Sequence, residues 1–457
     1  MRPYYLLMLS GMLSASLAYS AGMPPKTAEN SPISLKDSSG ITNLGDTSGV
    51  NTKIVKDRNL LLECPDFTSL RKYSVININK KNVSTDPATF KPTIQVGAIV
   101  HMFAFAEQDG YSNPQTAATP NSWNKGFTLY RARVLVGGQL SEKGSFFMET
   151  ELPSAIGGPN ADGTKNVKVS PIILDAQYQY NFANAFQVVA GQQLVSNNRN
   201  GLQGAAALMA NDFSYFQYPY NLFANSPLQG NFGRDLGVNT RGFLLNDKLE
   251  YRIGAFTGRN VDGKGPLRVV SRVAYNFLDP EKDYYYSGTN LGKGKTLSWA
   301  VGYDGQSDYH SLSTDLFLDH PLFGAGSVTL NTAFQYMTGG TDLTSKYSFA
   351  TLIPAQTVQF LELGYYFKAS KLQPWIKWEN EAISAKPEQT GGVAVNTFNK
   401  LNSSSVFGGG LNYFFNGLGT NLRLSYITRT YNVADALGNF DKKTYGQVWL
   451  QLQFFIF

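Results

Sequence analysis

The chain has 457 residues, of which 42% are hydrophobic but only 16% are charged, and it contains 44 Gly, 30 Phe and 26 Tyr. Soluble domains usually carry about 25% charged residues. A helical membrane protein needs apolar runs of about 20 residues, and no such run occurs after the first twenty positions. The composition disfavours both classes and suits a membrane-inserted β-barrel. Residues 93–457 hold 28 Lys and Arg against 26 Asp and Glu, so the sequence offers no basic surface for nucleic acid.

Residues 1–20 are typical of a secretory signal peptide. Arg2 supplies positive charge, an apolar stretch runs from Leu6 to Leu17, and small residues near Ala18 offer a cleavage site. This stretch is too short to span a membrane. We therefore expect export to the bacterial cell envelope, with the outer membrane as the destination of a barrel.

Residues 21–92 form a polar N-terminal extension, rich in Ser, Thr, Asn, Lys and Pro. Such a segment buries too little apolar surface to fold as a compact domain. We expect a partly disordered periplasmic extension, whose role stays open. The single cysteine, Cys64, lies within it and cannot form an internal disulfide.

Residues 93–457 are predicted to form the transmembrane barrel. Segments of about ten residues alternate in polarity between turn residues, which is the sequence pattern of a transmembrane β-barrel. The fold class is therefore all-β, a closed antiparallel barrel of about 16 strands. The predicted strands are 93–107, 126–140, 144–153, 170–181, 185–193, 235–246, 248–258, 266–278, 295–306, 311–320, 326–338, 357–369, 372–381, 404–415, 420–430 and 443–457.

The connections between these strands differ in length in a regular way. Most of the odd-numbered connections are long and most of the even-numbered ones are tight, which places the long loops outside and the short turns at the periplasmic end. Residues 279–294 break the rule, because they form a long connection where a tight turn is expected, and the sequence offers no explanation. The connections 259–265 and 307–310 are short where long loops are expected.

Several charged residues share the inner face of the predicted strands. Side chains alternate across a strand, and a charge on the lipid side costs roughly 2–4 kcal/mol at the midplane. The predicted pore-lining cations are Arg131, Arg133, Arg252, Arg268, Arg272, Arg423, Lys368 and Lys377. The same rule places Glu149, Glu151, Glu250, Glu362 and Glu379 inside. Two interpretations stay open: a track of guanidinium groups that binds anions, or Arg and Glu side chains that pair with each other.

The longest connection, residues 194–234, is a candidate for a constriction that folds into the barrel, because long loops are often functional. The residues that we single out in it are Arg199, Asp212, Tyr215, Tyr218 and Arg234. The alternative is an aromatic loop that packs over the barrel wall or against a neighbouring subunit.

The sequence offers little support for catalysis or for a cofactor. The three histidines, His101, His310 and His320, show no metal-ligand spacing, and no nucleophile-elbow motif occurs. His310, Ser313 and Asp315 lie close in sequence, but strand composition explains them better than a triad does. We therefore expect that the protein is not an enzyme and holds no cofactor.

A series of segments resembles the phosphate-selective porin O and P family. These segments are FTLYRARVLVGGQL, GSFFMETEL, DAQYQYNF, RDLGV, YRIGAFTGRN and RVAYNFLDPEKDYYYSG, in this order between residues 127 and 288. The resemblance implies a sixteen-stranded outer-membrane channel, a homotrimer, and a pore lined by Arg and Lys that passes anions such as phosphate. Matched residue by residue, the resemblance implies functional arginines at five positions, which are Arg131, Arg133, Arg234, Arg252 and Arg272. The central phosphate-binding lysines of the family have no counterpart in residues 194–234, which contain no lysine.

Taken together, the sequence predicts an outer-membrane porin, a passive diffusion channel for small hydrophilic solutes with a preference for phosphate-type anions. The expected partners are outer-membrane lipid, small anions as permeants and two further copies of the chain. Two alternatives stay open: a general porin with weak selectivity, and a structural or adhesive barrel with a closed lumen.

Overall fold

The computed structural model of the chain describes residues 90–111, 122–152, 171–215, 217, 233–260, 262–322, 324–338, 355–385, 401–434 and 439–457. The predicted signal peptide, residues 21–89 of the N-terminal extension with Cys64, and Tyr218 lie outside the described residues.

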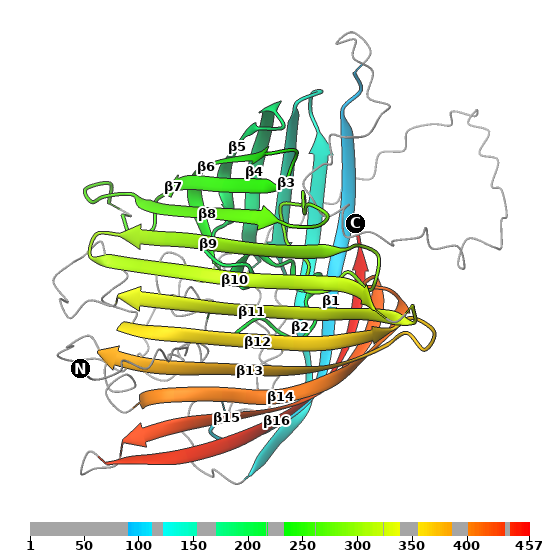
Figure 1. Ribbon diagram of the computed structural model, residues 1–457, viewed down its shortest axis with the longest axis vertical. Helices are drawn as coiled ribbons and strands as arrows, with labels where there is room; N and C mark the ends of the chain where they lie inside the picture. The colour runs from blue at the N-terminus through cyan, green and yellow to red at the C-terminus, as the bar shows by residue number, and fades with distance from the viewer. Residues whose placement is uncertain are drawn as a thin grey trace, which may run out of the picture. The chain divides into compact units, whose positions relative to one another are not determined.

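All sixteen predicted strands are confirmed, and they form one closed antiparallel barrel (Figure 1). The strands are β1 Thr93–Gln108, β2 Trp123–Gln139, β3 Gly144–Glu151, β4 Ile172–Ala183, β5 Phe186–Leu194, β6 Arg234–Leu244, β7 Leu249–Phe256, β8 Arg268–Asn276, β9 Thr296–Gln306, β10 Tyr309–Leu322, β11 Gly326–Thr338, β12 Ala355–Phe367, β13 Leu372–Ala385, β14 Leu401–Asn416, β15 Thr420–Ala434 and β16 Phe440–Ile456. Each strand pairs with its neighbours in the sequence, and β1 pairs with β16 to close the ring. Closure satisfies the backbone hydrogen bonds that lipid cannot satisfy.

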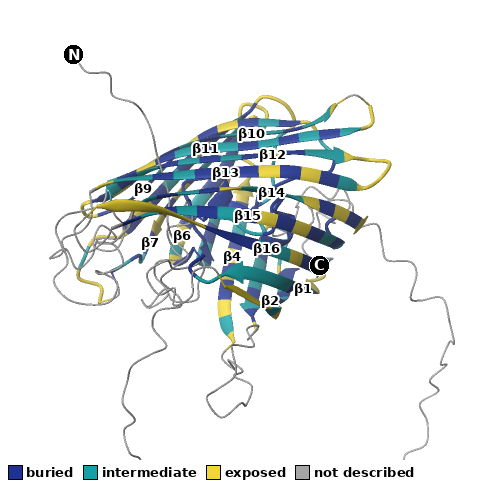
Figure 2. Cartoon of the chain, turned by 90° about the horizontal axis from the view of Figure 1, so that it is seen from below, coloured by how far each residue is buried: buried dark blue, intermediate teal, exposed yellow. Residues whose placement is uncertain are grey.

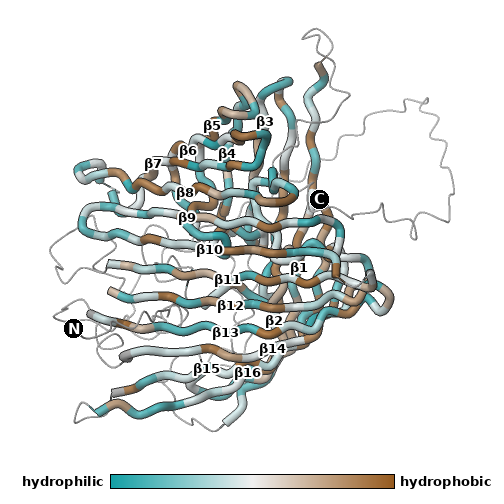
Figure 3. The backbone as a smooth tube through the Cα atoms, in the orientation of Figure 1, coloured by the Kyte–Doolittle hydropathy of each residue, from teal (hydrophilic) through white to brown (hydrophobic). Residues whose placement is uncertain are grey.

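The two faces of the wall differ in chemistry along every strand. Figure 2 shows buried and exposed residues alternating along the strands, and Figure 3 shows hydrophobic and hydrophilic residues interleaved along them. Outward positions carry exposed apolar side chains such as Leu236, Val238 and Ile253, whereas the intervening inward positions are buried and mostly polar. This is the pattern of a barrel with lipid outside and a polar lumen.

Aromatic side chains gather at one end of the barrel. Edge-to-face pairs of rings, two residues apart in the sequence, close strands β4, β8, β12 and β14 at the end where the short turns lie. Amphipathic rings at headgroup level form such a girdle in outer-membrane barrels. Among the residues that the structure describes, no helix is long and apolar enough to cross a membrane.

The connections at this end, which is the periplasmic end in barrels of this kind, are two to four residues long except one. The exception joins β8 to β9 and comprises residues 277–295. Its central part is buried, with Tyr284 only 1% exposed. The unexplained long connection of the sequence is therefore a segment that turns back into the barrel, and we call residues 277–295 the periplasmic insert.

Candidate channel constriction

The connection that follows β5 folds into the barrel from the opposite end. We call its residues 195–215 the inner loop. Two short 3-10 helices, Asn200–Leu202 and Ala205–Ala207, shape its middle, and most of its residues are buried. The predicted inward-folding connection is thus present in the structure.

The first part of the inner loop binds the wall at β9 and β10. The side chain of Asn197 donates hydrogen bonds to the Ser311 carbonyl and hydroxyl oxygens, at 3.2 and 3.0 Å. The Ser313 hydroxyl donates to the Asn197 carbonyl at 2.6 Å. Gly302 of β9 permits this approach, because a Cβ atom there would lie 1.9 Å from the Asn197 carbonyl oxygen. The loop backbone is therefore fitted closely to the wall.

The middle of the inner loop reaches β14 and β15. Arg423 donates hydrogen bonds to the carbonyl oxygens of Leu208 and Ala210, at 2.7 and 3.0 Å. Asn412 donates to the Met209 carbonyl at 2.8 Å. Met209 also packs in an apolar cluster with Trp375 and other residues of this wall. Arg423, predicted to line the pore, therefore holds the loop and is fully buried.

The end of the inner loop binds β2 through Asp212. Arg131 Nη2 lies 2.6 Å from Asp212 Oδ1, and the Tyr130 hydroxyl donates to the other carboxylate oxygen at 2.6 Å. A β-bulge lets two successive residues of β2 face the loop, because the register to β1 shifts between His101 and Met102. Burial opposes the ionisation of Asp212, but the attraction of Arg131 and the hydrogen bond from Tyr130 outweigh it and lower its pKa.

The same end of the loop also binds β13. Ser214 donates to the Glu379 carboxylate, and the Tyr215 amide donates to it at 3.2 Å. Lys377 lies 2.9 Å from Glu379 and donates to the Phe213 carbonyl at 2.9 Å. Because β5 and β13 are eight strands apart in a ring of sixteen, the inner loop crosses the lumen from one side to the other.

The other predicted arginines of the wall are buried and paired with carboxylates. Arg272 Nη1 lies 2.5 Å from Asp315, and Arg252 Nε lies 2.8 Å from Glu250. Arg133 binds two carboxylates, those of Glu149 and Glu151. Arg268 also binds two, those of Asp235 at 3.1 Å and Asp304 at 2.7 Å. The pairing interpretation of the inner charges therefore describes the structure better than a free guanidinium track.

The buried charges of the described part of the chain balance in number. Eleven cationic side chains and eleven carboxylates are buried there. The cations are Arg131, Arg133, Arg199, Arg234, Arg241, Arg252, Arg268, Arg272, Lys377, Arg423 and Arg429. The carboxylates are Glu149, Glu151, Asp175, Asp235, Glu250, Asp304, Asp315, Asp319, Glu362, Glu379 and Glu381.

Two of the predicted positions need correction. Lys368 does not line the lumen. Strand β12 ends at Phe367, so Lys368 lies exposed in the turn to β13, where side chains no longer alternate between the two faces of the wall. Arg234 is not a loop residue, because it begins β6 and binds Asp175 at 2.9 Å and Glu149 at 3.1 Å across the wall.

Arg199 does lie in the inner loop. Its guanidinium stacks on the rings of Phe317 and Tyr286, with centroid distances of 3.5 and 4.7 Å. It also binds the carboxylate of Glu281 in the periplasmic insert, at 2.6 and 2.7 Å. Arg199 is therefore occupied by contacts within the protein.

Sequence reasoning placed the glutamates of these pairs inside, but it missed Arg241, Tyr130 and the paired aspartates, which are Asp175, Asp235, Asp304 and Asp315. The alternation of side chains along a strand predicts the inward position of two of these residues. Leu236 and Val238 face outward on β6, so Arg241 faces inward. Leu312 faces outward on β10, so Asp315 faces inward. The inward position of Tyr130 depends on the bulge in β2, which no residue pattern signals.

The three residues that lie close in sequence near residue 310 do not form a triad. His310 is exposed on the outer face, where it bonds Tyr303 at 2.8 Å, whereas Ser313 and Asp315 are buried on the inner face. Within the described ranges, no group of three or more His, Cys, Asp or Glu side chains could hold a metal ion.

Comparison with solved structures finds outer-membrane channels of low sequence identity. The outer membrane channel DcaP of Acinetobacter baumannii is 12% identical, with a TM-score of 0.49, and the match covers 80% of this chain and 97% of that one. The anion-selective porin from Comamonas acidovorans is 10% identical, with a TM-score of 0.46, and the match covers 80% and 100%. OmpF of Salmonella typhi is 12% identical, with a TM-score of 0.46 and coverage of 79% and 97%.

No protein-family model matches the chain, and no curated protein matches it. At the identities and scores above, the similar structures assign no solute to this chain. The chain's own geometry, a closed sixteen-stranded antiparallel barrel with an apolar outer face and an inner loop, is the architecture of a bacterial outer-membrane β-barrel.

Proposed function

We propose that the protein is an outer-membrane channel for the passive diffusion of small hydrophilic solutes, with weak selectivity between anions and cations. The observation that carries the proposal is the inner loop, which starts at β5 and crosses a polar lumen to bind β13 on the opposite side. A barrel of 16 strands is wide enough to leave an aqueous channel. A loop across its interior narrows that channel and determines which solutes pass.

Weak selectivity follows from the paired charges. A unit charge 4 Å from an ion is worth about 1 kcal/mol in water and about 4 kcal/mol at an effective dielectric constant of 20. An anion that approaches Arg272 also meets the carboxylate of Asp315, which lies 2.5 Å from the guanidinium. The attraction and the repulsion largely cancel, so a passing ion of either sign gains little.

A preference for phosphate-type anions is the second candidate, and the family resemblance supports it. Arg423 favours it as well, because within the described residues this guanidinium binds carbonyl and amide oxygens and forms no ion pair. Its side chain is fully buried, however, and it holds the inner loop. An anion reaches it only if the loop moves, so weak selectivity is the better-supported proposal. The homotrimer that the resemblance implies stays a prediction, which the mass of the detergent-solubilised complex tests.

The test is the reversal potential of the purified protein in a planar bilayer under a tenfold KCl gradient. Ideal selectivity gives about 59 mV, and we expect a small fraction of this value because the lumen charges compensate each other. A potential near the ideal anion value, with block by added phosphate, contradicts weak selectivity and supports the second candidate. Absence of current from a folded barrel contradicts both and favours the structural barrel.

A further inference from the structure

We propose that the periplasmic insert is a second constriction of the channel, which sets its size limit together with the inner loop. This inference rests on the proposed function. It arises from the length of the insert, since the other described connections at the periplasmic end have two to four residues and the insert has 19. A connection this long is not needed to join β8 to β9, because the ladder between them already extends to Asp279 and Lys295, with an N–H···O distance of 2.9 Å.

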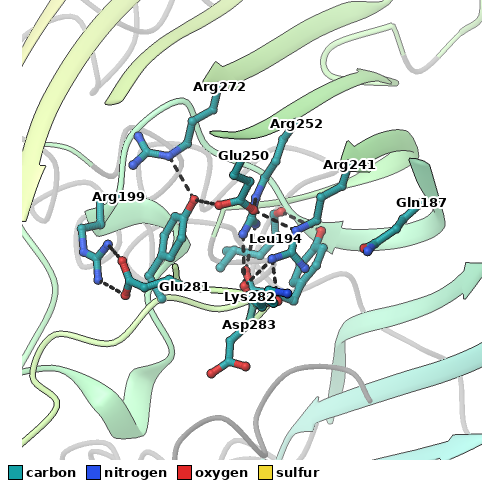
Figure 4. A network of polar contacts seen from close by, with 12 residues as sticks. Gln187, Leu194, Arg199, Arg241, Glu250, Arg252, Arg272, Glu281, Lys282 and Asp283 are labelled. Carbon is teal, nitrogen blue, oxygen red and sulfur yellow. Dashed lines mark hydrogen bonds and ion pairs between the residues drawn. The ribbon is translucent and has the colours of Figure 1, made fainter. Parts of the chain in front are cut away.

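Buried arginines of the wall hold the insert inside the barrel. Arg241 donates hydrogen bonds to the carbonyl oxygens of Lys282 and Asp283, at 2.8 and 2.7 Å. Arg252 donates to the Tyr284 carbonyl at 2.8 Å. Figure 4 shows both side chains reaching the backbone of the insert, and Glu250 binds the Nε atom of each arginine at 2.8 Å. Glu250 offsets one of the two arginine charges, and the arginines in turn satisfy carbonyl groups that are turned away from water.

The insert also meets the inner loop, backbone to backbone. The Tyr286 amide donates to the Leu202 carbonyl at 2.9 Å, and the Gly204 amide donates to the Tyr286 carbonyl at 3.1 Å. The Gly288 amide donates to the Ala207 carbonyl at 2.8 Å. A Cβ atom at Gly288 would lie 2.7 Å from the Met209 amide nitrogen, so this approach depends on glycine.

A latch at the periplasmic rim holds the start of the insert. The Lys282 ammonium binds Asp247, and Asn184 donates to the same carboxylate at 2.5 Å. The hydrogen bond from Lys282 is the largest cause of the lowered pKa of Asp247. Asp247 lies in a turn of three successive non-glycine residues with positive φ, 53°, 56° and 69° for residues 245 to 247. Asn and Asp tolerate this conformation better than other non-glycine residues, so its cost falls mainly on Leu245.

These contacts join two segments that enter the lumen from opposite ends. The inner loop comes from the external end and the insert from the periplasmic end, and they are hydrogen-bonded where they meet. Three tyrosines of the insert, Tyr284 to Tyr286, add bulk at this point and are buried. A solute must therefore pass around both segments, and the insert removes cross-section that the inner loop alone would leave open.

The experiment compares the full-length protein with a variant in which residues 280–294 are replaced by Asn-Gly, a dipeptide that forms a two-residue hairpin turn. We expect about a twofold rise in single-channel conductance and uptake of larger sugars in liposome swelling, because pore diameter governs both. An unchanged conductance in a folded variant overturns the inference and leaves the proposed function standing. Silence of both proteins contradicts the proposed function as well. Current from the variant alone overturns the inference, because the insert then closes the channel and does not set a size limit.

A second variant keeps the test decisive if the shortened chain does not fold. Asp283 is partly exposed, and Figure 4 shows its carboxylate directed away from Arg241 and Arg252. In a Cys64→Ser background, we expect an anionic methanethiosulfonate reagent to reduce the conductance of Asp283→Cys stepwise. Lys295→Cys, an exposed position at the rim, serves as the matched control and should show no change. Equal responses of the two variants overturn the inference.

Discussion

Replacing Asp212 by asparagine is expected to make the channel anion-selective. Arg131 lies 2.6 Å from this carboxylate, and the pair joins the end of the inner loop to β2. Asparagine keeps an oxygen that accepts the hydrogen bond from Arg131, so the geometry is retained while the negative charge is lost. The reversal potential under a tenfold KCl gradient should move toward the anion side by a substantial fraction of the ideal value of about 59 mV.

The matched control is Arg131→Gln, which leaves Asp212 without its cation and should move the reversal potential toward the cation side. Both shifts should shrink at 1 M salt, where the Debye length falls to about 3 Å. If the two variants shift the potential in the same direction, or neither shifts it, then this ion pair does not control the field at the constriction.

Replacing Arg268 by methionine is expected to destabilise the barrel by about 3–5 kcal/mol, the usual cost of leaving a buried charge without its partner. Arg268 is fully buried and joins β6 to β9 through Asp235 and Asp304, both also buried. Its removal leaves two carboxylates close together without a cation. Urea unfolding of the barrel in lipid vesicles measures the loss of unfolding free energy.

Two further variants separate the ion pair from the general effect of substitution. Lys264→Met changes an exposed lysine of the β7–β8 connection and should leave the unfolding free energy nearly unchanged. Adding Asp304→Asn to Arg268→Met should restore part of the lost stability, because one uncompensated carboxylate is removed. If Arg268→Met costs no more than Lys264→Met, the buried triad does not stabilise the barrel.

The strands and their faces could be predicted because lipid imposes one rule on every strand. A charge on the outer face is costly, so the alternation of side chains along β2, β8 and β15 predicts that Arg131, Arg272 and Arg423 face inward, and all three side chains are buried in the structure. The rule fails where a strand ends, as at Lys368, and where a bulge breaks the parity, as at Tyr130.

The contacts inside the lumen could not be predicted from the same rule. Parity states that Arg241 and Arg252 face inward, but it does not state that they bind carbonyl groups of the periplasmic insert. Those contacts depend on the direction that a long connection takes, and its length gives only the greatest distance that it can span. The excess length of residues 279–294 was visible in the sequence, whereas its direction into the barrel was not.

The most direct test of the account is whether the two segments meet inside the lumen. A Cβ atom built at Gly204 lies 3.7 Å from the Cβ of Tyr285, which matches the mean separation of about 3.8 Å in disulfides. In the Cys64→Ser background, Gly204→Cys combined with Tyr285→Cys should form a disulfide in outer-membrane preparations, seen as a mobility shift that reductant reverses. Gly204→Cys combined with Lys295→Cys should not form one. Failure of the first pair to cross-link in a folded barrel contradicts the meeting of the inner loop and the periplasmic insert.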